Sequence, residues 1–207
     1  MAIRKQDLYK VWDGENLIKS NIDFLLNRTK SVNFPLNEES KQIITDLEDT
    51  YQAVPCAGIA ANQLGYNKKL FIGMKHDRDK IASDDPSQNL DNIEPDPDNY
   101  DIYINPQIDK KDIKSTQSGA EACLSIPGLS LIIERYDEIK VRYYTVEGRA
   151  IKKPLKGFLS RLFQHELDHL NGKLMFENPI SKLDFHHIEE GLKPDIINAL
   201  FDYTTMK

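Results

Sequence analysis

Two histidines flank a glutamate in the segment FQHELDHLNG, which covers residues 163–172. An α-helix advances one turn in about 3.6 residues, so His165 and His169 would project from the same helix face, with Glu166 beside them. Neutral imidazoles bind zinc or iron, and an adjacent carboxylate can accept a proton from water that a metal activates. The pentapeptide HELDH therefore predicts a metal site that carries its own base.

The third ligand of this site has two candidates. A catalytic metal of this kind usually has three protein ligands and one open position. Glu189 follows His169 at a separation seen in zinc peptidases that complete their site with a downstream glutamate, within DFHHIEEGL, which we predict to be helical. Cys123 lies in EACLSIPG, between segments with strand character, although a buried cysteine often serves only as a small apolar side chain. The residues alone leave the choice between Cys123 and Glu189 open.

The histidine pair needs a helix to hold it. From Gly157 onward the pattern is helical, because Phe158, Leu162, His165 and His169 recur on one face. Gly172 is placed to end this helix in a left-handed conformation. A second helix is predicted over residues 194–203.

The region upstream predicts a helix followed by antiparallel strands. Asn37 can cap a helix that Pro55 ends. Short apolar runs at 70–73 and 101–105 read as strands, the second stopped by Pro106, and residues 139–155 read as two strands around a turn at 147–148. The predicted fold class is α+β, with antiparallel sheets packed around a central metal-binding helix.

Length and composition favour one catalytic domain over residues 1–207. The chain has 207 residues, 40% of them hydrophobic, which suits one compact core. Residues 76–101 contain nine Asp or Glu against one Arg and one Lys, so we expect an acidic surface insertion there.

Charge and cysteine content exclude several classes of protein. The formal net charge is -6, which argues against direct binding of nucleic acid. The N-terminal segment has no apolar run long enough for a signal peptide or a membrane span, so we expect a cytoplasmic protein with no membrane partner. Only Cys56 and Cys123 are present, and a reducing compartment argues against a disulfide between them.

Three separated segments carry a family resemblance. They are CAGIAANQLG at 56–65, EACLS at 121–125 and QHELDHLNG at 164–172. In this order they resemble the motifs Gly-x-Gly-x-Ala-Ala-x-Gln, Glu-Gly-Cys-Leu-Ser and Gln-His-Glu-x-Asp-His-Leu-x-Gly of the peptide deformylases. The sequence INPQI at 104–108 and Arg135 also fit the family's pattern. The resemblance covers most of the chain from Tyr51 to Pro179.

The resemblance implies an enzyme that removes the N-formyl group from the initiator methionine of nascent polypeptides and releases formate. It implies that Cys123, His165 and His169 bind one divalent metal ion. The ion expected from the family is Fe(II), and Zn, Ni or Co could replace it. Glu166 would be the acid–base residue. The side chain of Gln63 and the backbone N–H of Leu124 would face the substrate carbonyl.

The same resemblance implies how an N-formylmethionyl peptide would be held. Its backbone would pair as an added strand with Ala57, Gly58 and Ala122, and its methionine side chain would enter an apolar pocket that includes Leu162 and Leu124. Such an enzyme could also contact the ribosome locally.

Residues beside the predicted ligands have expected supporting roles. Asp168 could orient an imidazole, and Glu121 and Arg135 could form a buried pair that braces the loop of Cys123.

The chain departs from the family pattern at two glycines, which are replaced by Cys56 and Ala122. Ala122 fits only if its φ is negative, and Cys56 adds a side chain near the expected entrance of the methionine pocket. These two replacements keep open a metal-binding deformylase-like protein with reduced turnover. A zinc endopeptidase that takes Glu189 as its third ligand is the other alternative.

Overall fold

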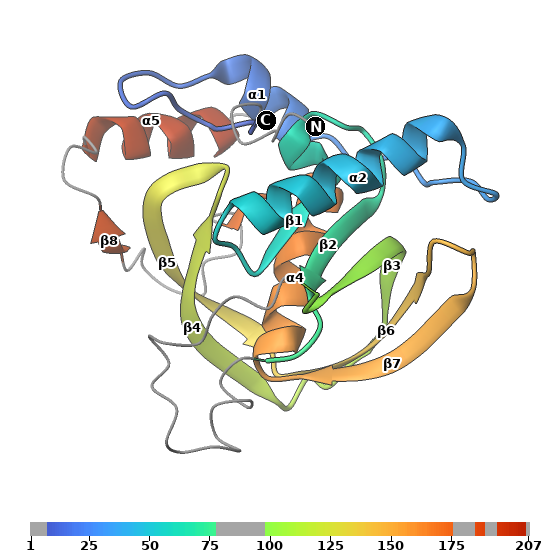
Figure 1. The fold of residues 1–207 in the computed structure, drawn as a ribbon. Helices are drawn as coiled ribbons and strands as arrows, with labels where there is room; N and C mark the ends of the chain where they lie inside the picture. The colour runs from blue at the N-terminus through green and yellow to red at the C-terminus, as the bar shows by residue number, and fades with distance from the viewer. Residues whose placement is uncertain (1–7, 78–97, 176–184, 189–193, 206–207) are drawn as a thin grey trace, which may run out of the picture.

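The computed structural model describes residues 8–77, 98–175, 185–188 and 194–205, and its ribbon shows two antiparallel sheets around one helix (Figure 1). The five-stranded sheet has the order β1-β2-β3-β6-β7 and the three-stranded sheet has the order β4-β5-β8. The strands of the first are β1 Gly58–Ala60, β2 Leu70–Met74, β3 Tyr100–Lys111, β6 Glu138–Tyr144 and β7 Ala150–Lys156. Those of the second are β4 Thr116–Cys123, β5 Ile126–Tyr136 and β8 Phe185–Ile188.

Helix α4, Phe158–Leu170, lies between the sheets at the centre of the molecule (Figure 1). Phe163 and Leu170 are each 1% exposed and pack against the five-stranded sheet, where the Phe163 ring meets Phe71 and Tyr103 edge-on. Gly172 has φ +73°, as expected for a residue that ends a helix in the left-handed region. The predicted α+β class, with antiparallel sheets around this helix, is confirmed.

The other helices cover the outside of the sheets. In α2, Glu38–Ala53, the side chain of Asn37 accepts a hydrogen bond from the Ser40 amide, which confirms the predicted cap. Helix α5, Pro194–Thr205, lies beside α1, Lys19–Leu25, where the Tyr203 hydroxyl donates to Asp23 over 2.7 Å. No helix in the described ranges has the length and apolar character needed to cross a membrane.

Strand β3 does not stop at Pro106, as predicted, but continues to Lys111. The pairing of β3 with β6 shifts register between Ile104 and Gln107, so Pro106 sits in an irregularity where its missing N–H interrupts no regular ladder. Asn105 precedes it with φ +50°, a conformation that asparagine tolerates better than most residues.

Asn105 also ties β3 to the segment before α2. Its side-chain amide donates to the Val32 carbonyl and accepts from the Val32 amide, each over 2.8 Å. We expect Asn105→Ala to lower the free energy of unfolding by about 2 kcal/mol, because it loses both bonds and strains the backbone. Asn105→Gly should cost less, since glycine adopts this φ freely. Urea denaturation of the two variants checks the order, and equal losses would contradict it.

Two other expectations concern segments that the structure describes only in part. The segment DFHHIEEGL was predicted to be helical, but Phe185–Ile188 form strand β8, which pairs with β5 through Leu129↔Ile188 and Ser130↔His187. The helix prediction was wrong because these residues complete a sheet. Glu189 lies outside the described residues, as does most of the predicted acidic insertion, at 78–97. The last two positions of that insertion, Tyr100 and Asp101, already belong to β3.

Candidate active site

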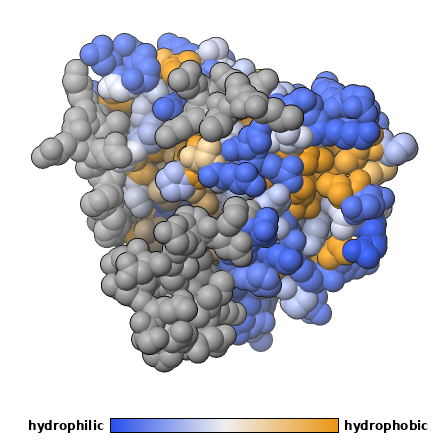
Figure 2. Space-filling view, in the orientation of Figure 1, coloured by the Kyte–Doolittle hydropathy of each residue, from blue (hydrophilic) through white to orange (hydrophobic). Residues whose placement is uncertain are grey.

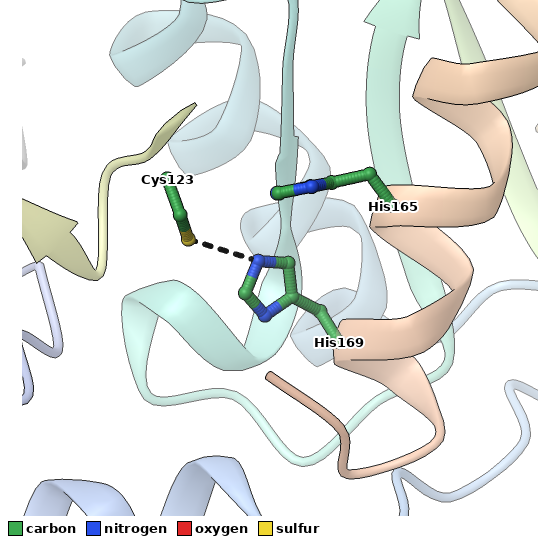
Figure 3. A group of neighbouring side chains, drawn as sticks. All are labelled: Cys123, His165 and His169. Carbon is green, nitrogen blue, oxygen red and sulfur yellow. Dashed lines mark hydrogen bonds between the residues drawn. The ribbon is translucent and has the colours of Figure 1, made fainter. Parts of the chain in front are cut away.

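Cys123, His165 and His169 come together although they lie on different elements. Cys123 is the last residue of β4, whereas the two histidines lie one turn apart on α4. The potential ligand atoms of all three lie within 4.8 Å of one another, and Cys123 Sγ is 3.2 Å from His169 Nε2. Figure 3 shows the thiol and both imidazoles pointing toward the same point.

These three side chains fit a divalent metal ion by their chemistry. One thiol and two imidazoles are donors that zinc and iron accept. The Nδ1 atom of His165 is bonded to Glu121 Oε2 at 2.9 Å, so its Nε2 atom is left for an ion. Cys123 is 6% exposed and His169 is 2% exposed, so these two donors are buried, whereas the side chain of His165 is 12% exposed.

Cys123 is held in the form that binds metals. Burial raises the pKa of its thiol, but the neighbouring imidazoles of His169 and His165 lower it by more, and the pKa falls to about 5. The thiolate is the form of cysteine that ligates metals.

Glu166 lies beside this cluster with an unused oxygen. The residue is 3% exposed, and its Oε2 atom is buried without a hydrogen-bond partner among the described residues. Burial is the main cause that raises the pKa of Glu166 to about 7. A buried oxygen that the protein leaves unpaired can serve a water molecule or a substrate, and a carboxyl group with this pKa can both accept and return a proton near neutral pH.

Glu121, and not Asp168, lies against the ring of the first histidine. Arg135 donates to both oxygens of Glu121 over 2.9 Å, so the predicted buried pair is confirmed. The Glu121 carboxylate also receives Arg161 at 2.8 Å and contacts His165. Asp168 accepts from Arg135 instead. The hydrogen bonds from His165 and Arg135 outweigh the effect of burial and hold the pKa of Glu121 below its ordinary value.

The sequence interpretation missed Arg161. A signal for it was present, because Arg161 lies four residues before His165 and therefore on the apolar face of α4. A charged residue on a face that is otherwise buried requires a partner, and here that partner is Glu121.

Gln63 is fixed with its amide group directed at Cys123. It belongs to the short helix η2, Ala61–Leu64, which follows β1. Its Oε1 atom accepts from the Ala60 amide at 2.9 Å, and its Nε2 atom donates to Ser125 Oγ at 3.2 Å. The same Nε2 atom donates its second hydrogen to Cys123 Sγ over 3.6 Å, which places a hydrogen-bond donor at the edge of the cluster.

A cavity of about 640 Å³ opens onto this cluster. The predicted residues that line it are Ala57, Gly58, Gln63, Ala122, Cys123, Leu124, Leu162, His165 and Glu166. His169 lies behind this wall. Strand β1 and strand β4 are each the terminal strand of their sheet and both contribute to the lining, so two strands that each pair on one side only border the cavity.

The two departures from the family pattern are accommodated. Among the described residues other than glycine, Asn105 alone has a positive φ, so the backbone of Ala122 has the negative φ that we required. Cys56 lines the cavity and is partly buried against the apolar cluster of α2 and β2.

Gly58 must be a glycine for the cavity to keep its shape. A Cβ atom at this position would lie 2.7 Å from Glu166 Oε1 and 2.9 Å from Leu162 Cδ1. We expect Gly58→Ala to lower kcat/KM by about 100-fold at unchanged metal content, because it displaces Glu166 rather than a ligand. Metal analysis with steady-state kinetics on a formylated peptide checks this, and an unchanged kcat/KM would contradict it.

Comparison with known proteins agrees with the geometry. The sequence model of the family described as Polypeptide deformylase matches residues 15–185. The chain is 32% identical to a peptide deformylase of Elusimicrobium minutum, over 89% of this chain and 93% of that protein.

Solved structures of deformylases are similar as well. A peptide deformylase from Thermotoga maritima superposes with a TM-score of 0.60 and 28% identity, covering 77% of this chain and 93% of that one. A class I type b peptide deformylase from Acinetobacter baumannii, bound to Met-Ala-Ser, gives a TM-score of 0.63 and 27% identity over 75% and 92% of the chains. The family model and these relatives agree with a metal-type cluster formed by the HELDH helix and a cysteine from the neighbouring sheet. The chain therefore belongs to the polypeptide deformylase family.

Proposed function

We propose that this protein removes the N-formyl group from N-formylmethionyl polypeptides at the cavity beside Cys123, with Glu166 as the acid–base residue. Peptide deformylases act on the N-formyl group of nascent polypeptides and use a divalent metal. The observation that carries the assignment of residues is the meeting of Cys123, His165 and His169 beneath one cavity, with the unpaired oxygen of Glu166 beside them.

Cys123, His165 and His169 would hold the metal ion. When bound there, the ion supplies a Lewis acid and lowers the pKa of water. We propose Fe(II) as the native ion, as the resemblance to the peptide deformylases implies. A thiolate with two imidazoles suits soft and borderline metals, so the same donors would also accept Zn, Ni and Co.

Glu166 would move the proton. Its carboxylate takes a proton from the attacking water and gives it to the amine that leaves when the formamide C–N bond breaks. Support comes from the raised pKa of Glu166, about 7, which makes the two transfers similar in cost near neutral pH.

Gln63 and Leu124 would stabilise the charge that develops on the formyl oxygen. The amide group of Gln63 is held near Cys123 by the bonds to Ala60 and Ser125, and the hydrogen that it directs at Cys123 Sγ would turn to the formyl oxygen. Leu124 follows Cys123 in the turn between β4 and β5 and would donate its backbone N–H. Removing one such donor costs about 2.7–4 kcal/mol of transition-state stabilisation in other enzymes.

The peptide would lie as a strand between the two edges of the cavity. Ala57 and Gly58 on one side and Ala122 on the other expose backbone that can pair with it. The methionine side chain would fill the apolar part of the cavity beside Leu162 and Leu124.

We further propose that residues 1–207 act as one domain in the cytoplasm. Both cysteines are free, as is usual for proteins of a reducing compartment, which supports that location. A local contact with the ribosome would raise the concentration of nascent chains near the cavity.

Formate release tests the function directly. Protein loaded with Fe(II) without oxygen is given formyl-Met-Ala-Ser and, as control, acetyl-Met-Ala-Ser; the parent tripeptide is chosen because the A. baumannii relative binds Met-Ala-Ser. We expect one formate per free amine from the formylated peptide and none from the acetylated one. Cleavage between Met and Ala without formate would favour the endopeptidase and overturn the proposal.

A further inference from the structure

Arg161 is a buried cation whose hydrogen bonds all go to the sheet that carries Cys123. Its side chain is 7% exposed, and it projects from α4. The guanidinium donates to the carbonyls of Gln117 and Ile133 over 3.0 Å and 2.9 Å, and to that of Gly119 over 3.2 Å. Its remaining partner is Glu121 Oε1, at 2.8 Å. Arg161 therefore links α4 to both β4 and β5.

Glu121 is the point where this link meets the metal cluster. Its Oε1 atom accepts hydrogen bonds from Nε of Arg135 and Nη1 of Arg161. Its Oε2 atom accepts a hydrogen bond from Nη2 of Arg135 and contacts Nδ1 of His165. Each oxygen thus has two partners. The side chain of Glu121 is 4% exposed, so water does not replace a partner that is lost.

We propose that Arg161 is a positioning residue for the metal centre, which acts through Glu121 on the ring of His165. Arg161 and His165 are one turn apart on the same helix and bind opposite oxygens of one carboxylate. A rotation of the Glu121 carboxylate would break its bond to Arg161 or its bond to His165. These two residues therefore fix the plane of the carboxylate relative to α4. The fixed plane in turn fixes the direction of the His165 Nδ1 bond and of its free Nε2 atom.

The packing around Arg161 matches this role. A Cβ atom on Gly119 would lie 3.2 Å from Arg161 Nη2, tighter than ordinary contact. Strand β4 therefore has its smallest residue where the guanidinium crosses it, two residues before Glu121. A side chain at this position would press on the guanidinium close to its bond with Glu121.

Two roles for Arg161 make different predictions. If it only holds the sheet to the helix, its loss should weaken metal binding independently of Glu121. If it acts through Glu121, its loss should matter only while Glu121 is present, so the two substitutions will not be additive.

A double-mutant cycle on metal dissociation distinguishes them. Zn(II) is loaded into the wild type, Arg161→Met, Glu121→Gln and the double variant, and its transfer to an excess of chelator is followed. We expect Arg161→Met to raise the dissociation rate about 10-fold and Glu121→Gln about 10- to 100-fold, as for other outer partners of metal ligands. The double variant should match Glu121→Gln within about twofold. A rate equal to the product of the two effects would overturn the proposal.

Gln164 provides a matched control. It is buried on the same helix, and its side chain hydrogen-bonds Tyr136 and Ser160, with a bond of 2.8 Å to the Tyr136 carbonyl, rather than Glu121. Gln164→Met should combine multiplicatively with Glu121→Gln, and coupling as strong as that of Arg161 would contradict a specific role.

Two milder variants keep the test usable if Arg161→Met does not fold. Arg161→Lys retains the charge and should restore part of the Zn(II) retention. Gly119→Ala crowds the guanidinium and should raise the dissociation rate in the same direction by less. The inference rests on the proposed ligand set, and the two fail differently. If the wild type binds no Zn(II), both the ligand set and the role of Arg161 are wrong. If the wild type binds Zn(II) and Arg161→Lys and Gly119→Ala release it no faster, only the role of Arg161 is wrong.

Discussion

Glu166→Ala is expected to keep about one metal ion per chain and to lose turnover by about 10²- to 10⁴-fold. Glu166 lies beside the three ligands but is not one of them, and its Oε2 atom has no partner among the described residues. Removing the carboxylate therefore removes the proton carrier and leaves the donors for the ion in place.

Glu166→Gln is the matched variant, because it keeps the volume of the side chain but cannot accept the proton. It should lose turnover to a similar extent. Metal analysis together with single-turnover formate release checks both variants. If either variant loses its metal, Glu166 is a ligand and its proposed role is wrong.

Cys123→Ser should abolish deformylation and weaken metal binding, whereas Glu189→Ala should retain both. A hydroxyl is a far poorer ligand than a thiolate at neutral pH, and the low pKa of Cys123, about 5, means that the thiolate is the form lost. Metal content after gel filtration and formate release under the same conditions provide the comparison. The zinc-endopeptidase alternative requires the reverse result, with Glu189→Ala stripping the metal.

The histidine pair and its helix could be predicted from local spacing. Residues His165, Glu166 and His169 share one face of a helix whatever the rest of the chain does, and Gly172 ends that helix by its own conformational freedom. The spacing of these residues alone predicts a metal site, so the ten residues 163–172 are enough to expect one.

The partner of that pair could not be chosen from spacing. Cys123 reaches the histidines because β4 and α4 pack together, a contact between residues more than forty positions apart. Within the sequence, only the resemblance to the peptide deformylases at 56–65 and 121–125 favours Cys123 over Glu189. The surrounding carboxylate network depends on the same packing, so local spacing suggests Asp168 as a partner for an imidazole, whereas Glu121 is the residue that contacts His165.

The errors in the fold also come from long-range pairing. Pro106 ends a strand in isolation, but the bulge opposite β6 lets β3 continue past it. The sequence pattern predicts a helix over Phe185–Ile188, but these residues pair with the edge of β5 and form strand β8. In both cases the neighbouring strand, and not the local sequence, decides the conformation.

The third sequence hypothesis, a metal-binding relative with reduced turnover, rested on Cys56 and Ala122. Ala122 has negative φ, and both residues line a cavity that remains open to Glu166. The comparisons support the deformylase function and give no support to the alternatives.

The central claim, that Cys123 completes the metal site, is tested most directly by the absorption spectrum of the Co(II)-substituted protein. Thiolate ligation gives a sulfur-to-metal charge-transfer band in the near ultraviolet. We predict that this band is present in the wild type, persists in Cys56→Ser and disappears in Cys123→Ser. Survival of the band without Cys123 would contradict the proposed ligand set.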